Sequence, residues 1–194
     1  MIISGCDPGL EGAITFLDPA RLTITIHDMP TLLLKRGGKS KREVDGHSLA
    51  RTFRLARPDH VFVELAGAVP PIKSAGTNRK GGQGVSSAFA GGKGYGIILG
   101  VLAALEIPYS IVAPQTWKKA LAVPAEKDGA RARASQLMPG DGDKWPLNKH
   151  HGRAESALVA LHGVRTLGEV AAPPPDLFAG CTALDREIAR GGWR

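Results

Sequence analysis

The chain has 194 residues, a hydrophobic fraction of 43% and a formal net charge of +7. This length suits one domain with a substantial core plus an extension. No run of about 18 apolar residues and no basic leader precedes Asp7, so we expect neither a membrane span nor a secretion signal. The basic excess favours a polyanionic partner such as nucleic acid.

The two cysteines, Cys6 and Cys181, lie near opposite ends of the chain. Cys6 falls within an apolar, strand-like run, where a buried free thiol is the expected state. Without a disulfide framework or a secretion signal, the sequence predicts a cytoplasmic protein in a reducing compartment.

The first half of the chain predicts three antiparallel strands, a helix and a fourth strand. Short apolar runs end in Asp-Pro turn signals, and the third run alternates apolar and polar residues. Leu49, Phe53 and Ala56 share one helical face. The predicted strands cover residues 2–6, 12–17, 22–27 and 60–65; the helix covers 48–56, and loops cover 33–46 and 66–84.

The second half predicts a long glycine-containing helix over 86–106 and a strand over 108–112. Further helices begin at Pro114 and cover 127–137 and 150–162, with Gly163 as the C-cap of the last. The fold class is therefore α/β, with a five-stranded mixed sheet flanked by helices. Residues 1–163 would form this domain, and 164–194 a Pro-rich tail with a short helix near 184–189.

Four side chains of this arrangement can converge on one point. Asp7 ends the first strand, Glu64 stands in the fourth, and His151 and Glu155 are four residues apart on one helical face. Three carboxylates and one imidazole suit Mg²⁺ or Mn²⁺. Two such ions about 3.5–4 Å apart can activate water and stabilise the leaving 3′-oxygen in phosphodiester hydrolysis.

Each of these residues also has a structural interpretation. Asp7 precedes Pro-Gly and fits a turn residue, and His151 and Glu155 fit a solvated helix face. Glu64 favours function, because a carboxylate within Val-Phe-Val-Glu-Leu is costly to bury unpaired.

Six segments resemble, in register, the motifs of the RuvC-type Holliday-junction resolvases, nucleases of the ribonuclease H-like fold. The resemblance runs from residue 1 to about 163 and is closest to phage-type members. The six segments are GCDPG at 5–9, VE at 63–64, FAGGKGYG at 89–96, VAPQTWK at 112–118, KD at 127–128 and RAESAL at 153–158.

The resemblance implies a homodimer that places two active sites, each with two Mg²⁺ or Mn²⁺ ions, on a four-way DNA junction and nicks two strands symmetrically. Lys118 and Lys127 would stabilise charge at the scissile phosphate, although spacing alone also fits solvated lysines. Phe89 would be a core residue or a junction wedge, and its apolar helix favours the core. The basic residues predicted to contact DNA are Lys73, Arg79, Lys80 and Lys93.

The chain departs from the family pattern on the last helix. RuvC proteins generally carry a second acid three residues before the position of Glu155, where this chain has Gly152. His151 is the expected substitute, and His150 is a fallback that points off the Glu155 face. Asp141 and Asp143 are acidic loop residues that we do not favour as ligands.

Three other functions remain open at this point. Sugar kinases and actin-like ATPases have a related fold with an early phosphate-binding Asp-x-Gly turn, but they need a longer chain. A non-catalytic DNA-binding module is favoured only by Gly152. Another ribonuclease H-like nuclease, acting on RNA or a hybrid duplex, would use the same acids.

Overall fold

The computed structural model describes residues 1–67, 85–126 and 128–168. Its main sheet has five strands in the order β3-β2-β1-β6-β7. β1–β2 and β2–β3 pair antiparallel, whereas β1–β6 and β6–β7 pair parallel. The strands are β1 (Ile3–Cys6), β2 (Ala13–Asp18), β3 (Thr23–Asp28), β6 (His60–Glu64) and β7 (Tyr109–Val112). The predicted mixed sheet with three antiparallel first strands is confirmed.

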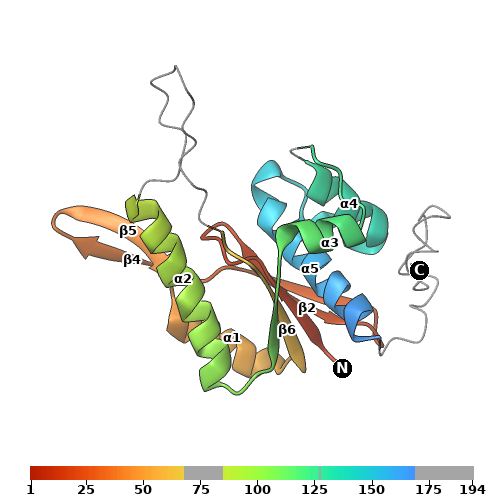
Figure 1. Ribbon diagram of the computed structural model, residues 1–194, viewed down its shortest axis with the longest axis horizontal. Coiled ribbons are helices and arrows are strands. Elements are labelled where there is room, and N and C mark those ends of the chain that lie inside the picture. The colour runs from red at the N-terminus through yellow and green to blue at the C-terminus, as the bar shows by residue number, and fades with distance from the viewer. Residues whose placement is uncertain (68–84, 127, 169–194) are drawn as a thin grey trace.

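Helices cover both faces of this sheet (Figure 1). Because alternate residues of a strand point to opposite faces, Cys6, Val61 and Val63 enter one core, while Ile3 and Phe62 enter the other. The first core packs on α1 (Gly46–Ala56) and α2 (Val85–Ala104), and the second on α3 (Pro114–Ala120), α4 (Gly129–Leu137) and α5 (His151–Leu167). Two 3₁₀ turns, η1 (Pro139–Lys144) and η2 (Asn148–His150), lead into α5.

The loop predicted over 33–46 is wrong, because a separate hairpin occupies most of it. β4 (Thr31–Arg36) and β5 (Lys39–Val44) pair antiparallel. They are joined by Gly37 and Gly38, whose φ values of 55° and 75° suit the tight turn of a twisted hairpin. The hairpin extends beside the N-terminal part of α2, away from the main sheet (Figure 1). Its mostly polar strands lack the apolar alternation that would have revealed it.

The last helix continues past its predicted end at residue 162. α5 ends at Leu167 and is capped by Gly168 in the left-handed region, with φ of 63°. Gly163 is not a cap but a packing position, since a Cβ there would lie 2.3 Å from the Phe62 ring. The proposed tail begins inside this helix, and the predicted helix near 184–189 lies outside the described residues.

α5 lies directly on the central strand of the sheet. A Cβ at Gly5 would be 2.1 Å from the carbonyl oxygen of Ser156 and 2.3 Å from the amide nitrogen of Ala160. The helix and the strand can approach this closely because Gly5 has no side chain. A buried hydrogen bond of 2.8 Å between the hydroxyls of Thr15 and Ser156 also fastens the helix to β2. These contacts fix the position of Glu155.

α2 differs from the other described helices in its exposed apolar surface. By length and mean hydropathy (1.3), Ser86–Ala104 alone among the described helices could cross a membrane, and little of this stretch is buried. In the sequence it is not one continuous apolar run, because Lys93 interrupts it. A single such helix is weak grounds for a membrane span, and a large apolar surface also marks protein interfaces.

Candidate active site

Asp7 and Glu64 stand next to each other at the ends of two neighbouring parallel strands. Cys6 pairs with Val63, so Asp7 and Glu64 follow one residue beyond this last pair. Side chains alternate between the two faces of a strand, and Asp7 and Glu64 stand an even number of residues after Ile3 and Phe62, respectively. Both carboxylates therefore face the side that α5 covers. Asp7 Oδ1 also accepts a 3.1 Å hydrogen bond from the Gly9 amide, which holds it in the turn.

Gly152 brings the backbone of α5 against Asp7. A Cβ at Gly152 would lie 2.5 Å from the carbonyl oxygen of Glu11 and 2.9 Å from Asp7 Oδ2. The position at which RuvC proteins generally carry an acid therefore has no room for a side chain here. The acid that the family resemblance led us to expect three residues before Glu155 therefore has no counterpart at this position.

Glu155 and Lys118 form an ion pair at the same end of the sheet. Lys118 Nζ lies 3.0 Å from Glu155 Oε1, and it stands 5.0 Å from the centroid of the Trp117 ring. Pro114 begins α3, which carries both Trp117 and Lys118. Lys118, which the family resemblance implies lies near the scissile phosphate, thus lies beside Glu155.

Burial and mutual repulsion perturb the two strand carboxylates. Burial raises the pKa of Asp7 to about 6, with Glu155 adding to the rise and the Gly9 amide, His151 and Lys118 opposing it. Burial raises the pKa of Glu64 to about 7, and the charges of Asp7 and Glu155 add to it. Three acids in one electrostatic environment create a demand for positive charge, which Lys118 meets only in part.

Trp117 is a residue of the site that the sequence analysis did not single out. Its side chain is fully buried. Its indole N–H faces the Glu64 carboxylate and lowers its pKa, without reaching the geometry of a full hydrogen bond. The signal in the sequence was a tryptophan directly before a candidate catalytic lysine, since a buried indole N–H needs an acceptor.

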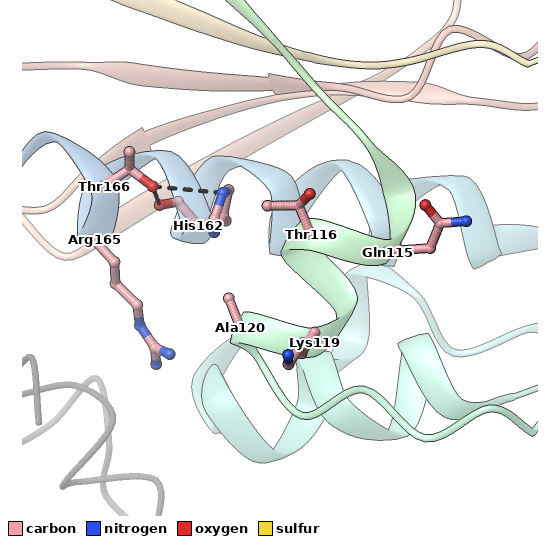
Figure 2. Close-up of a pocket in the computed structure, with 7 residues that line it drawn as sticks. All are labelled: Gln115, Thr116, Lys119, Ala120, His162, Arg165 and Thr166. Carbon is pink, nitrogen blue, oxygen red and sulfur yellow. Dashed lines mark hydrogen bonds between the residues drawn. The ribbon is translucent and has the colours of Figure 1, made fainter. Parts of the chain in front are cut away.

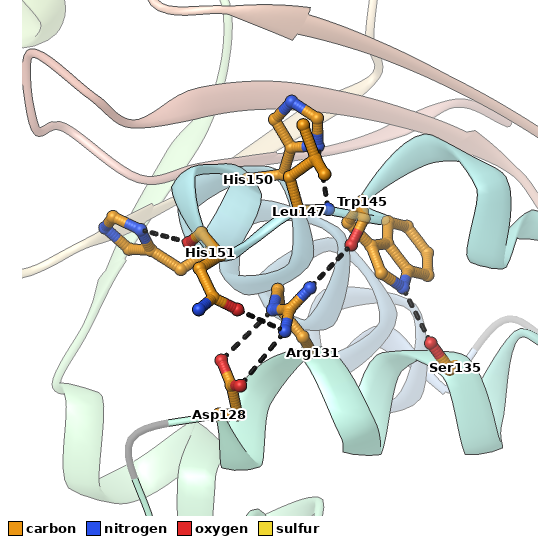
Figure 3. A network of polar contacts seen from close by, with 8 residues as sticks. Asp128, Arg131, Ser135, Trp145, Leu147, His150 and His151 are labelled. Carbon is orange, nitrogen blue, oxygen red and sulfur yellow. Dashed lines mark hydrogen bonds and ion pairs between the residues drawn. The ribbon is translucent and has the colours of Figure 1, made fainter.

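His151 is the histidine on the side of Asp7. It is exposed, yet its charge acts on Asp7, and its Nδ1 lies 3.3 Å from the backbone oxygen of Asn148. With the proton on Nδ1, Nε2 remains free to accept a cation. His150 instead accepts from the Leu147 amide at 3.3 Å and lies near Asp28. The two rings point in different directions (Figure 3).

Arg131 fixes the segment that leads into α5 (Figure 3). Its guanidinium donates to the Asn148 side chain at 2.7 Å and to the Trp145 carbonyl at 3.2 Å, and it pairs with Asp128 at 3.0 Å. The Trp145 indole donates to Ser135 at 2.9 Å. This network places the first residue of α5, His151, beside the acids.

The donor set suits a divalent cation, but the described side chains are not gathered around one. Among residues 1–67, 85–126 and 128–168, no group of three or more His, Cys, Asp or Glu side chains could hold a metal ion as placed. The chemistry of Asp7, Glu64 and Glu155 nevertheless fits: hard oxygen donors with raised pKa values at Asp7 and Glu64, which a cation would lower.

Other predicted residues lie away from these acids. Lys93 on α2 forms an ion pair with Glu43 of the hairpin. Phe89 is 75% exposed, so the expectation of a core position is wrong; it lies near the start of α2. Asp141 and Asp143 lie 2.5 and 4.0 Å from Lys144 in η1. The predicted Lys73, Arg79, Lys80 and Lys127 lie outside the described residues.

The hairpin supplies one more contact that the sequence did not reveal. Arg42 on β5 forms an ion pair with Glu11 and donates to the Leu10 carbonyl at 3.0 Å. These residues belong to the turn between Asp7 and β2. Arg42 therefore braces the turn from one side while Gly152 contacts it from the other.

No protein-family model matches the chain, and no curated protein does. Solved structures do match. Thermus thermophilus RuvC in complex with a Holliday junction substrate is 16% identical with a TM-score of 0.52, covering 87% of this chain and 96% of that one. A second T. thermophilus RuvC structure is 16% identical with a TM-score of 0.48, and the match covers 88% of this chain and 98% of that one. The fowlpox virus Holliday junction resolvase is 18% identical with a TM-score of 0.44, and the match covers 86% of this chain and 99% of that one. The strand order and the match to the first of these structures show that the chain has the RuvC-type resolvase fold, which is a ribonuclease H-like α/β fold.

Proposed function

We propose that this protein is a Mg²⁺- or Mn²⁺-dependent endodeoxyribonuclease that resolves four-way DNA junctions by paired symmetric nicks. One observation carries the proposal. Asp7, Glu64 and Glu155 come together beside Lys118 at one end of a sheet of the RuvC type. A half-buried cluster of three acids is costly for a fold to maintain unless its charge is used.

The residues would divide the chemistry as follows. Asp7, Glu64 and Glu155 would hold two divalent cations, with His151 as the fourth member of the set. When bound, such ions supply an activated water and neutralise charge on the phosphate. Lys118 would add positive charge beside the scissile phosphate, and Lys127 is assigned the same role from the family resemblance.

Binding of the junction would rest on basic and aromatic groups outside the acids. The net charge of +7 favours phosphate contacts, for which Lys73, Arg79, Lys80 and Lys93 remain the predicted residues. The exposure of Phe89 favours the wedge role over the core role, because an exposed aromatic ring can stack on an unpaired base.

The proposal includes a homodimer, because two nicks at symmetric positions need two active sites. The exposed face of α2 supports this assembly. Gly92, Gly96 and Gly100 repeat every four residues on that face, and a Cβ at each would meet nothing within 4 Å. Together with the low burial of this apolar helix, they offer a surface on which a second copy can pack closely. We place the protein in a reducing cytoplasm, where the buried Cys6 stays a thiol.

Cleavage of a synthetic four-way junction tests the proposal. With Mg²⁺ or Mn²⁺ the protein should nick two opposed strands of the junction, and cut linear duplex, RNA–DNA hybrid and RNA much more slowly. Asp7→Asn and Glu64→Gln should abolish cleavage and leave junction binding intact. Preferred cleavage of hybrid or RNA, or binding without any cleavage, would refute junction resolution in favour of another ribonuclease H-like nuclease or a binding module.

A further inference from the structure

A pocket of about 550 Å³ lies between α3 and α5, outside the acidic site (Figure 2). None of the described residues that line it is acidic. α3 contributes Gln115, Thr116 and Lys119, and α5 contributes His162, Arg165 and Thr166. In Figure 2 the Thr116 and His162 side chains lie between the two helices and Arg165 extends from α5, whereas the Gln115 amide points away from Arg165.

The chemistry of the lining suits an anion with several oxygen acceptors. Lys119 and Arg165 bring two positive charges from different helices. Within the described part of the chain, the Lys119 ammonium has no ion-pair or hydrogen-bond partner. Gln115 and Thr116 add neutral donors. A phosphate ester offers the charge and the acceptors that such groups bind.

His162 does not add a third charge to the pocket. Burial lowers its pKa, and the charge of Arg165 lowers it further. Its ring packs edge-on against Phe62, with centroids 6.2 Å apart, and its Nε2 faces the Thr166 hydroxyl at 3.5 Å. The neutral ring forms a wall, so Lys119 and Arg165 carry the positive charge among the lining residues.

The pocket lies in line with the acids. His162 follows Glu155 by seven residues, or about two helical turns, which puts both on one face of α5 with a rise on the order of 10 Å. On α3, Lys119 directly follows Lys118, which pairs with Glu155. At about 3.4 Å per nucleotide of one strand, this rise spans about three nucleotides.

We propose that this pocket is a subsite for the phosphate backbone of a bound DNA strand, about three nucleotides from the phosphate that is cut. The subsite rests on the proposed function for its ligand. Its volume falls within the range of ligand sites and exceeds what a single ion needs, which suits a sugar–phosphate unit. Lys119 and Arg165 hold the phosphate, and Gln115 and Thr116 donate hydrogen bonds to it.

Junction binding without divalent cation tests the subsite independently of cleavage. The protein with both Lys119→Gln and Arg165→Gln should bind a four-way junction about tenfold more weakly, and the slope of log K against log salt should fall by about 2. Arg51→Gln with Arg54→Gln, on exposed positions of α1 on the other face, removes the same charge and should leave the slope close to the parent's. A slope equal to the control's would overturn the subsite.

Two further measurements complete the test. Since Arg165 is partly buried, Lys119→Gln alone, at an exposed position, should still lower the slope by about 1, and Lys119→Arg should restore it. A neutral methylphosphonate three nucleotides from the cleavage point should weaken binding of the parent but not of the double variant. Equal weakening of both would refute the assigned register.

A free nucleotide distinguishes the two possible sources of the phosphate, the DNA backbone and a small ligand. Deoxyadenosine monophosphate at millimolar concentration should show no calorimetric binding that depends on Lys119 and Arg165; if it does, the pocket takes free nucleotide and the backbone assignment is wrong. If the slope falls as expected but no junction is cleaved, the proposed nuclease function and the register relative to a cut phosphate fail, while the contact of Lys119 and Arg165 with the DNA backbone stands. If the junction is cleaved and the slope is unchanged, only the subsite fails.

Discussion

Asp7 and Glu64 carry their charges at a cost to the metal-free protein. Their pKa values are raised, to about 6 and about 7, chiefly by burial. A carboxyl group with a raised pKa binds its proton more tightly in the folded state than in the unfolded chain. The free energy of unfolding therefore falls as pH rises from the ordinary carboxyl range through 7.

Glu64→Gln should consequently stabilise the metal-free protein at pH 8. We expect a gain of about 1–3 kcal/mol in the free energy of unfolding, since each tenfold change in proton affinity is worth about 1.4 kcal/mol, and little difference from the parent at pH 4. Urea unfolding at the two pH values measures it. Mg²⁺ should stabilise the parent and not the variant; a gain of the same size at both pH values would contradict the electrostatic origin.

Activity should rise with pH through the same range. Asp7 and Glu64 can hold a cation only when deprotonated, so cleavage at fixed Mg²⁺ should increase between about pH 6 and pH 7.5. Higher Mg²⁺ should move the midpoint to lower pH, because the cation competes with the proton. A midpoint independent of the Mg²⁺ concentration would show that other groups govern the profile.

His151 and His150 provide a matched pair for the fourth ligand. His151→Ala should reduce cleavage strongly, because His151 acts on Asp7, while His150→Ala should cut nearly as well as the parent. His151→Asp should lower the ratio of activity with Mn²⁺ to that with Mg²⁺, since an oxygen ligand is harder than imidazole. If His150→Ala lost activity and His151→Ala kept it, His150 and not His151 would be the fourth ligand.

Helix α5 is the element on which the site depends, and its placement relies on glycine. Gly152→Ala would set a Cβ 2.5 Å from the Glu11 carbonyl oxygen and 2.8 Å from Gly12 Cα, both backbone atoms that cannot yield without moving the turn. We expect a loss of about 1–3 kcal/mol in the free energy of unfolding and weaker cleavage, because Asp7 and Glu155 must separate.

The same substitution in η1, away from the proposed dimer face, is the control. A Cβ at Gly140 meets open space and its φ is not positive, so Gly140→Ala should stabilise the protein by up to about 1 kcal/mol by restricting the unfolded chain. The midpoint temperatures of thermal unfolding of the two variants should therefore shift in opposite directions from that of the parent. If both were stabilised, the close contact of α5 with the turn after Asp7 would be wrong.

Helix α2 is the element on which the proposed dimer depends. Gly96→Arg places a long charged side chain in the middle of its open face and should convert the dimer to a monomer, as measured by sedimentation equilibrium. Gly140→Arg adds the same group at another open position, in η1, and should leave the dimer intact. A dimer that survives Gly96→Arg would need a different interface.

At the scale of the whole molecule, the sequence predicted the architecture well because its signals are local. Alternation in residues 22–27 and the apolar runs that contain Cys6 and Val63 mark strands that the structure confirms. The hairpin of residues 31–44 was missed because most of it lies outside the core, with Val44 as its buried residue among those described, and only Gly37-Gly38 marked it. Gly163 looked like a helix stop, but packing against Phe62 overrides that local signal.

In the candidate site, too, local signals were predictable from the sequence and long-range contacts were not. Chain order was enough to place Asp7 and Glu64 side by side and Glu155 near them. The reason for Gly152 was not readable, since it lies in a contact with Glu11 that is 141 residues distant in sequence. Trp117 and Arg131 were missed for the same reason. Metal binding and the catalytic roles stay predictions for the experiments above.

The contact of α5 with β1 joins the last described element to the first. Glu155 is synthesised 148 residues after Asp7, and Gly5 meets α5 only after every strand of the main sheet has been made. Long-range contacts of this kind form slowly, and domains are synthesised from the N-terminus. On the ribosome, a nascent chain that already displays Asp7, Glu64 and Lys118 therefore still lacks its third acid, so the proposed nuclease would not cut DNA until α5 has left the exit tunnel and docked.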